Sequence, residues 1–168
     1  LAINRPEITD SVLKKGDISY GLFVPPGLPN YQNAANPQIF DPEKGRELLK
    51  TAGFDEKKPF PILHIHYNKA TDRELVTKAA ATMWEKNLGL RTQLIEDNWN
   101  DYLSKRQKRD YEISWGGWYG DYLDPNTFLE LFTTTHRQNH AGWSNPRYDA
   151  LIRKVKAEHD SKLRMQYF

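Results

Sequence analysis

The sequence predicts an α/β fold in which helices flank a sheet. Three segments have the alternating or apolar pattern of strands, at residues 62–67, 90–96 and 111–117, and helical segments separate them. Strands that alternate with helices indicate crossover connections, which parallel strands require. The chain has 168 residues and no cysteine, so it is long enough to bury a core and must do so without disulfides.

The amino-terminal segment opens with a helix start signal. Asn4 can accept hydrogen bonds from the first-turn amides and Pro6 is tolerated in that turn, so we expect a helix that reaches about Lys15 and ends before Gly16. Residues 17–39 contain several prolines and asparagines and show no sustained period. This composition predicts a long ordered loop or a lid-like segment.

Caps mark the next two helices. Asp41, which is followed by proline, opens the second helix, and Gly53 closes it with a left-handed residue. After the strand at residues 62–67, Thr71 and Glu74 have the spacing of a capping box. The third helix is expected to extend from this box to Asn87.

The second half of the chain continues the alternation. A strand at residues 90–96 leads into a helix at 99–109, and the third strand follows at 111–117. Two further helices are expected to begin at Asp124 and Asn145, because each of these capping residues precedes a proline.

Composition excludes several classes of protein. The net charge is +2, from 24 basic and 22 acidic residues that are interleaved along the chain, so nucleic acid is not an expected partner. No apolar run approaches the roughly 20 residues of a membrane span. Residues 1–3 and 161–168 both look like interrupted helices, and we therefore expect a fragment of a longer protein.

Residues 115–122 combine glycines, aromatic side chains and a carboxylate. Gly117 has no side chain, so another chain can approach its backbone closely, and Trp118 and Tyr119 supply flat apolar walls. Asp121 follows where the strand ends and is free to meet a cation. The segment is equally well explained as a buried aromatic strand followed by a solvated turn.

Metal and cofactor sites are not expected. His64 and His66 lie two apart on one strand face, and His136 and His140 could lie four apart on a helix, but neither pair has a third ligand nearby. We interpret these histidines as surface residues or as satisfied by protein partners.

Signals of catalysis are weak. The sequence has no phosphate-binding loop, no dinucleotide-binding glycine motif and no nucleophile elbow. Asp121 and Asp124 could serve a hydrolase as a carboxylate pair, but an aspartate before Pro125 is more simply a turn residue or helix cap.

The remaining tryptophans and arginines fall into two groups. Trp84 lies on a helical stripe that predicts core packing, whereas Trp99 opens a helix beyond a strand end, where ligands of open α/β sheets bind. Arg106 and Arg109 could both be solvated, and for Arg109 we prefer this interpretation. Trp143 could be a pocket wall or could cover the following helix.

Several motifs occur here in the order in which they occur in one protein family. They are Ala2-Ile-Asn-Arg5, Phe23-Val-Pro-Pro-Gly27, Leu48-Leu49-x-x-Ala52-Gly53-Phe54, Trp84-x-x-Asn87-Leu88-Gly89, Gly117-Trp118-x-x-Asp121-Tyr122-x-Asp124-Pro125 and Asn145-Pro146-x-Tyr148-Asp149. The chain thereby resembles the extracytoplasmic oligopeptide-binding proteins of peptide ABC importers, solute-binding protein family 5.

This resemblance implies one lobe of a two-lobed periplasmic-binding-protein type II fold, with a mixed sheet flanked by helices. Residues 1–168 correspond to a single carboxy-terminal ligand-binding lobe, and the amino-terminal lobe is missing. The family binds short peptides in extended form between the lobes and delivers them to the membrane permease outside the cytoplasm. The resemblance implies no enzyme activity.

The resemblance also implies roles for individual residues. The family pairs the peptide with backbone at the positions of Gly117, Trp118 and Tyr119, which suits a strand-addition mode. Asp121 matches the carboxylate that holds the peptide's amino-terminal ammonium.

Trp99 and Trp118 match aromatic walls of side-chain pockets. Arg106 matches a basic position that some relatives use toward the peptide carboxylate, and Arg73 matches a histidine with a similar role. Some relatives place a second arginine at the position of Trp115, so the preferred peptide length is left open.

Three alternatives remain beside peptide binding. The same fold could bind an oligosaccharide or a metal chelate, since tryptophans also stack on sugars. The chain could be a hydrolase that uses Asp121 and Asp124. It could also be a cytosolic regulator that uses this fold as a sensor.

Overall fold

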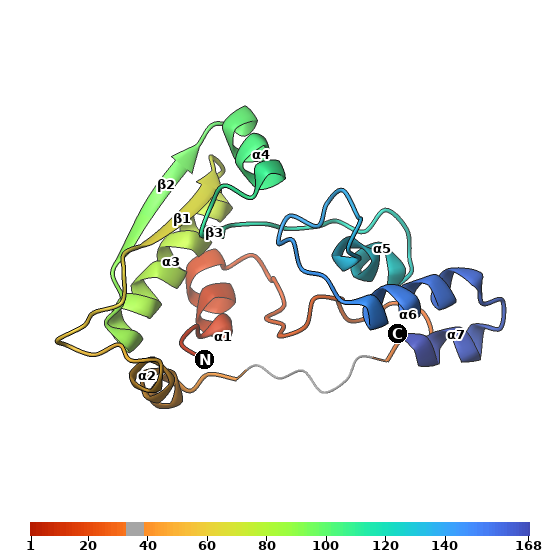
Figure 1. The fold of residues 1–168 in the computed structure, drawn as a ribbon, viewed down its shortest axis with the longest axis horizontal. Helices are drawn as coiled ribbons and strands as arrows, with labels where there is room; N and C mark the ends of the chain where they lie inside the picture. Colours follow the sequence, from red (N-terminus) through yellow and green to blue (C-terminus); the bar gives the residue numbers. More distant parts are fainter. Residues whose placement is uncertain (33–38) are drawn as a thin grey trace. The chain divides into compact units, whose positions relative to one another are not determined.

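The computed structural model describes residues 1–32 and 39–168 (Figure 1). The chain divides into two compact units, each of which is described by itself. Unit 1 consists of Leu1–Gly21, Gln38–Arg106 and Asp110–Gly116, and unit 2 consists of Leu22–Pro37, Gln107–Arg109 and Gly117–Phe168.

Unit 1 contains a three-stranded sheet. Its strands are β1 (Leu63–Asn68), β2 (Thr92–Asp97) and β3 (Ile113–Ser114), in the order β2-β1-β3. Both pairings are parallel, as the helical crossovers require. The predicted α/β fold is confirmed. The sheet is not mixed, however, because no antiparallel pair occurs among the residues that the structure describes.

Helices of unit 1 pack on this sheet and on one another. They are α1 (Arg5–Glu7), the π-helical segment η1 (Ile8–Leu13), α2 (Pro42–Thr51), α3 (Thr71–Leu88) and α4 (Trp99–Lys108). The long helix α3 contacts β1 and β2, and η1 and α2 pack against α3 (Figure 1). Ile65 and Tyr67 of β1 and Ala81 and Met83 of α3 are buried residues of this unit.

Two of the three helix caps predicted in unit 1 are confirmed by their hydrogen bonds. Asn4 accepts from the amide of Glu7 at 3.3 Å, and Asp41 accepts from the amide of Lys44 at 2.9 Å. Gly53, with a φ of +85°, follows α2 as expected. These short polar side chains satisfy amides that have no partner within the helix.

Two expectations about helix ends are wrong. The capping box at Thr71 is absent, because Thr71 already belongs to α3 and Ala70 occupies the cap without a side-chain bond. Glu74 instead lies 2.5 Å from Lys78, one turn later. The first helical segment ends at Leu13 and not at Lys15, because Lys14 adopts a left-handed conformation with a φ of 54°.

The third strand is much shorter than predicted. Only Ile113–Ser114 pair as β3, and a last bond joins the amide of Trp115 to the carbonyl of His66 at 2.8 Å. Gly116 and Gly117 follow, and glycines weaken a strand because they offer no side chain to pack. The segment from Gly116 to Gly120 has no regular secondary structure.

Unit 2 is helical in its described residues. It contains α5 (Asn126–Leu129), the 3₁₀ segment η2 (Glu130–Phe132), α6 (Pro146–Ala157) and α7 (Ser161–Tyr167). The predicted cap at Asn145 is confirmed, since its side chain accepts from two amides of α6. Phe128, Leu131, Ile152 and Val155 form the buried core of this unit.

Residues 17–32 and 39–40 contain neither helix nor strand, which agrees with the predicted loop, and residues 33–38 of that prediction lie outside the described part. Within the described ranges, no helix combines the length and apolar character of a bilayer-spanning segment.

Candidate ligand-binding site

The seven predicted site residues divide between the two units. Arg73, Trp99 and Arg106 belong to unit 1, and Gly117, Trp118, Tyr119 and Asp121 belong to unit 2.

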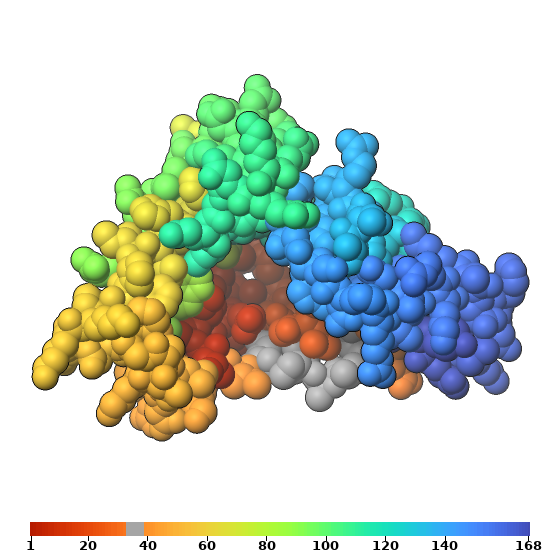
Figure 2. Space-filling model, viewed as in Figure 1, coloured from red at the N-terminus to blue at the C-terminus, as the bar shows by residue number. Residues whose placement is uncertain are grey.

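Trp99 is the first residue of α4 and stacks on a buried tyrosine. Its ring centroid lies 5.6 Å from that of Tyr102, with an angle of 27° between the planes. Tyr102 is only 3% exposed, whereas Trp99 is 54% exposed and leaves most of its indole available. The space-filling view shows α4, in green, at the molecular surface (Figure 2).

Arg106 lies one turn after Tyr102 on the same helix and is fixed by it. The guanidinium carbon is 5.2 Å from the centre of the Tyr102 ring, and Nη1 donates to the Tyr102 hydroxyl at 2.5 Å. Cation–π attraction and the hydrogen bond together orient the planar group. Its Nε is buried and has no partner among the described residues.

Arg73, in the first turn of α3, is held in a similar way. Its Nη1 donates to Oδ1 of Asn68 at 2.5 Å, and its guanidinium carbon lies 4.9 Å from the centre of the Trp115 ring. Asn68 ends β1 and is buried. Trp115 thus serves as a platform for a cation.

Tyr102 connects these contacts, and the sequence reasoning missed it. Its hydroxyl donates to the carbonyl of Trp115 at 2.7 Å while it accepts from Arg106. The spacing from Trp99 to Tyr102 and on to Arg106 is three and then four residues, which places all three on one helix face and could have identified Tyr102. We call Arg73, Trp99, Tyr102, Arg106 and Trp115 the guanidinium–aromatic cluster.

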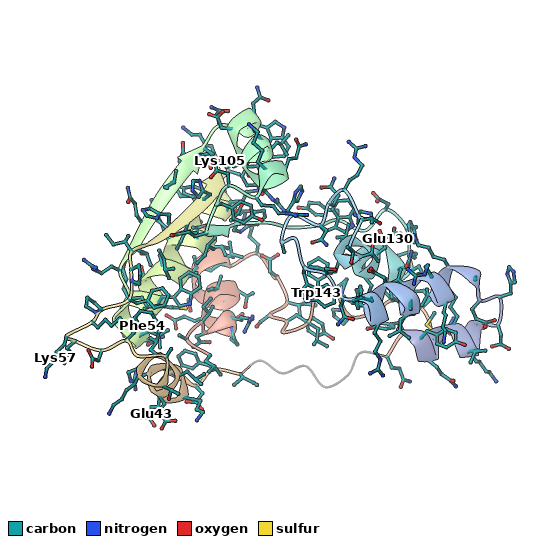
Figure 3. The ribbon with its side chains drawn as sticks, viewed as in Figure 1. Glu43, Phe54, Lys57, Lys105, Glu130 and Trp143 are labelled. Atoms are coloured by element: carbon teal, nitrogen blue, oxygen red, sulfur yellow. The ribbon has the colours of Figure 1, made fainter. Side chains whose placement is uncertain are left out.

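An ion pair with a buried carboxylate lies on another part of α4. Lys105, labelled in Figure 3, has its Nζ 2.5 Å from Oδ1 of Asp97, and Nδ1 of His66 lies 2.8 Å from Oδ2. Burial opposes ionisation of Asp97, but the hydrogen bonds from Lys105 and His66 outweigh it and hold the pKa of that carboxyl below its usual value. This pair joins α4 to the ends of β1 and β2.

In unit 2, the residues that follow Gly116 and Gly117 expose aromatic side chains. Tyr119 is 92% exposed, and Trp118 is half-buried. The indole Nε1 of Trp118 is buried without a hydrogen-bond partner in the described part of the chain. Because Gly117 to Tyr119 are not in a strand, their backbone groups are not committed to the sheet of unit 1.

Asp121 is held through its backbone and leaves its carboxylate in solvent. Its amide donates to Oγ1 of the buried Thr127 at 3.0 Å, whereas no lysine or arginine of the described residues forms an ion pair with the carboxylate. The preceding Gly120 permits this turn, since a Cβ there would come within 2.9 Å of Phe128 and 3.0 Å of Thr127.

Asp124 has a different environment from Asp121. It forms a bidentate ion pair with Arg164, with Oδ1 2.8 Å from Nη2, and it also accepts from the amide of Asn126 at 2.9 Å. Burial opposes its ionisation, but these bonds lower the pKa of Asp124 overall. The predicted turn at Asp124 is confirmed, but Asp124 is not the helix cap, because α5 begins at Asn126 and Pro125 occupies its N-cap. A carboxylate so engaged does not support the hydrolase alternative.

The histidine pairs have protein partners. Nδ1 of His64 lies 3.0 Å from Glu112, and Nδ1 of His136 accepts from the amide of Gln138. His136 and His140 lie in turns and not on the helix considered above. No cluster of three metal-ligating side chains occurs in the described ranges.

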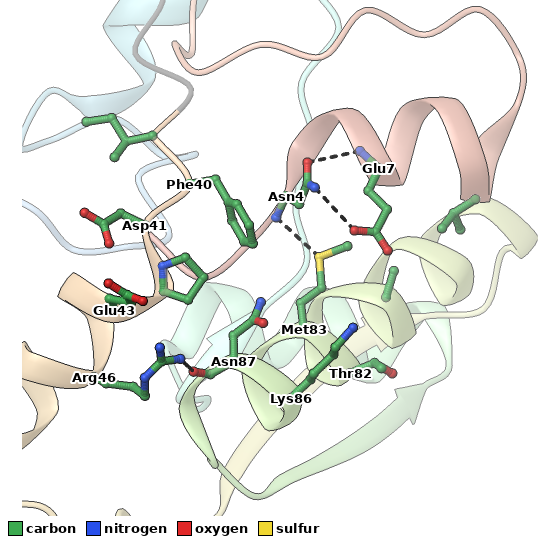
Figure 4. Close-up of a pocket in the computed structure, with 14 residues that line it drawn as sticks. Asn4, Glu7, Phe40, Asp41, Glu43, Arg46, Thr82, Met83, Lys86 and Asn87 are labelled. Carbon is green, nitrogen blue, oxygen red and sulfur yellow. Dashed lines mark hydrogen bonds between the residues drawn. The ribbon is translucent and has the colours of Figure 1, made fainter.

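Unit 1 also has a surface hollow of about 1200 Å³ that contains none of the predicted residues (Figure 4). Met83 and Asn87 of α3 line it together with Asn4 and Arg46. The amide of Asn4 donates to the Met83 sulfur at 3.4 Å, and Arg46 donates to the carbonyl of Asn87 at 2.7 Å.

Comparisons with known proteins place this geometry in a family. The chain is 31% identical over 169 residues to the periplasmic murein peptide-binding protein MppA of Escherichia coli, covering 98% of this chain and 31% of the relative. It is 29% identical over 175 residues to the oligopeptide-binding protein OppA of Bacillus subtilis, covering 98% and 32%.

Solved structures of relatives have the same fold. The E. coli murein tripeptide-binding protein MppA matches with a TM-score of 0.91 at 30% identity, over 99% of this chain and 33% of that protein. Haemophilus influenzae OppA in complex with RPPGFSPFR matches with a TM-score of 0.90 at 28% identity, over 99% and 34%. These relatives have the periplasmic-binding-protein type II fold, and this chain spans about a third of their length.

The family model described as "Bacterial extracellular solute-binding proteins, family 5 Middle" matches residues 1–140, most of the chain. The chain belongs to the family of bacterial extracellular solute-binding proteins, family 5.

Proposed function

We propose that the chain is part of a receptor that binds short peptides in extended form between two lobes. In this receptor the residues described here supply one ligand-binding lobe, carboxy-terminal in the full protein, and a further amino-terminal lobe completes it. The receptor delivers its peptide to the permease of an ABC importer. It acts outside the cytoplasm, in agreement with the family's description as extracellular and with the names of its periplasmic relatives. No bond of the peptide is made or broken.

The unpaired carboxylate of Asp121 carries this proposal. It is exposed and its backbone is fixed by Thr127, so the charge has a defined position and no basic partner among the described residues. Such a group suits the ammonium at the amino terminus of a peptide. Backbone at Gly117, Trp118 and Tyr119, outside any strand, is available to pair with a peptide main chain.

Unit 1 offers charges of the opposite sign. Arg73 and Arg106 are oriented by aromatic rings and neutral oxygens, and neither forms an ion pair within the described residues. The carboxylate of a peptide is complementary to these two guanidinium groups of unit 1. A neutral oligosaccharide has no such charge, which makes that alternative less suitable.

The test is calorimetry on the full-length protein with two forms of one alanine peptide, with a free and with an acetylated amino terminus. Asp121→Ala is expected to weaken binding of the free peptide by about 10- to 100-fold, the equivalent of roughly 1.5 to 3 kcal/mol for a charge-assisted hydrogen bond. The acetylated peptide should lose little. Asp110→Ala, at another exposed aspartate, is the matched control.

Equal losses for the two peptides would remove Asp121 from this role. Binding of cello-oligosaccharides but of no peptide of three to five residues would overturn the proposed ligand class.

A further inference from the structure

Basic side chains in this structure are held either by a carboxylate or by uncharged groups. Arg164 is neutralised by the carboxylate of Asp124, as is Lys105 by Asp97. Arg73 and Arg106 are held as firmly, but by uncharged groups, namely tyrosine and tryptophan rings and the oxygens of a hydroxyl and an amide. These two guanidinium groups are therefore oriented without being neutralised, as a site for an anion requires.

The position of Arg106 depends on the absence of a side chain at residue 116. A Cβ on Gly116 would lie 3.0 Å from Nη2 and 3.3 Å from both Cζ and Nη1 of Arg106. Because the three distances are so similar, the flat face of the guanidinium lies against the position that a Cβ of residue 116 would occupy. The φ of Gly116 lies outside the left-handed region, so the glycine is needed for this close approach and not for the backbone conformation.

The Tyr102 hydroxyl fixes the orientation of the same group. Its hydrogen is used toward the carbonyl of Trp115, so a lone pair faces Nη1 of Arg106. The hydroxyl is buried with its ring, which is 3% exposed and stacked beneath Trp99. It therefore cannot turn away to solvent, and Arg106 has one favoured position.

We propose that Tyr102 and Gly116 are positioning residues that hold Arg106 ready for the carboxylate of the ligand. This inference rests on the proposed function, since it assumes a ligand with a free carboxylate. It adds two residues that touch no ligand themselves. They determine whether the receptor distinguishes a peptide acid from the corresponding amide.

Calorimetry on the full-length protein tests the inference with alanine peptides of three to five residues, each as the free acid and as the carboxy-terminal amide. The variants are Tyr102→Phe, which keeps the ring and removes only the hydroxyl, and Gly116→Ala, which displaces the flexible end of Arg106. Arg106→Ala and the double variant Tyr102→Phe/Arg106→Ala complete a cycle. Tyr67→Phe is the matched control, at a tyrosine of unit 1 that is 5% exposed.

We expect Tyr102→Phe and Gly116→Ala each to weaken binding of the acid by about 5- to 20-fold and binding of the amide by less than about twofold. In the Arg106→Ala background, Tyr102→Phe should cause no further loss for the acid. Tyr67→Phe should leave the acid-to-amide ratio unchanged. A tyrosine or glycine that served only the fold would weaken both ligands alike.

Three results separate this inference from the proposed function. If the wild-type protein binds no peptide, the proposed function fails and the inference fails with it. If the wild type binds acid and amide equally well, peptide binding stands but Arg106 does not meet the carboxylate, and the inference is overturned. It is also overturned if either variant weakens acid and amide equally, or if the losses from Tyr102→Phe and Arg106→Ala are additive.

Discussion

Gly116 and Gly120 lie four residues apart, and a side chain would be excluded at each for a different reason. A side chain at Gly116 would meet the flexible end of Arg106, whereas one at Gly120 would meet the ring of Phe128 and the methyl group of Thr127. Phe128 and Thr127 are 8% and 1% exposed and have no room to move. Gly120 is thus required by packing, and Gly116 by the position of one cation.

Gly120→Ala is therefore expected to lower the free energy of unfolding by about 1–3 kcal/mol, the usual cost of forcing extra atoms into a packed core. Gly116→Ala is the control and should cost much less, because the end of Arg106 can shift. Chemical denaturation of the two variants measures both values. Equal costs would contradict the different packing at the two positions.

At the scale of residues, the sequence predicted exposed and turn residues better than contacts between distant residues. The exposed carboxylate of Asp121 and the turn at Asp124 followed from local pattern, since turns depend on neighbouring residues. Tyr102 was missed because its importance comes from Trp115 and Arg106, and the bond to Trp115 joins separate elements. No residue type announces such a contact.

At the scale of elements, α4 is the helix that presents Trp99 and Arg106, and an ion pair with a buried carboxylate attaches it to the sheet. Lys105 of α4 meets Asp97 at the end of β2, and His66 of β1 meets the same carboxylate. The side chain of Asp97 is 6% exposed. A charge at that depth stabilises the fold only while its partners are present.

Asp97→Asn should destabilise unit 1 by about 1.5–3 kcal/mol near neutral pH, because Lys105, which is partly exposed, then loses its only carboxylate among the described residues. The folded-state pKa of Asp97 lies below the ordinary value of 3.8, so its contribution is complete above that pH and is lost as the pH falls through the lower folded value. The difference between wild type and variant should therefore shrink below about pH 4.

Denaturation curves from pH 3 to pH 8 measure this difference. Asp72→Asn is the matched control, since its ion pair with Lys15 is exposed and should contribute less than about 1 kcal/mol. A difference for Asp97→Asn that stays constant down to pH 3 would contradict the assigned role of the carboxylate.

Helix starts were predicted well and strand lengths poorly. Asn4, Asp41 and Asn145 are caps in the structure because a short polar side chain satisfies local amides. The capping box at Thr71 failed because Ala70 occupies the cap. The length of β3 depends on how many of its residues form hydrogen bonds with β1, and the residues of β3 alone do not determine this.

At the scale of the whole molecule, the chain consists of two compact units whose internal order differs. In unit 1 the central strand β1 is bonded on both sides, to β2 and to β3. In unit 2 the residues between Gly117 and Leu123 lack regular structure, and Tyr119 and Leu123 are 92% and 81% exposed. The local free energy of opening should follow this contrast.

Hydrogen exchange on the full-length protein without ligand should show this difference in the local free energy of opening. The amides of Ile65 and Tyr67 in β1 are expected to exchange slowest in unit 1, and those of residues 117–119 fast. If the proposed function is correct, a bound peptide should slow exchange in residues 117–119 and leave β1 unchanged. Slow exchange of residues 117–119 without ligand would contradict their freedom from internal bonding.

The order of strands and helices, together with the motifs in sequence, was sufficient to predict the family, and the comparisons confirm it. That residues 1–168 form one carboxy-terminal lobe stays a prediction. Sequence pattern describes neighbours along the chain, and the association of compact units depends on surfaces that such a pattern does not contain.

The neutral partners of Arg73 and Arg106 have a consequence for how ligand binding depends on pH. The groups that hold these arginines are Asn68, Tyr102 and the Trp115 ring, and none of them carries a charge. A guanidinium paired with glutamate or histidine would change its effective charge as the medium acidified. If the proposed function is correct, the attraction of these guanidinium groups for the ligand should persist as the medium acidifies, until the carboxylate of the ligand is itself protonated.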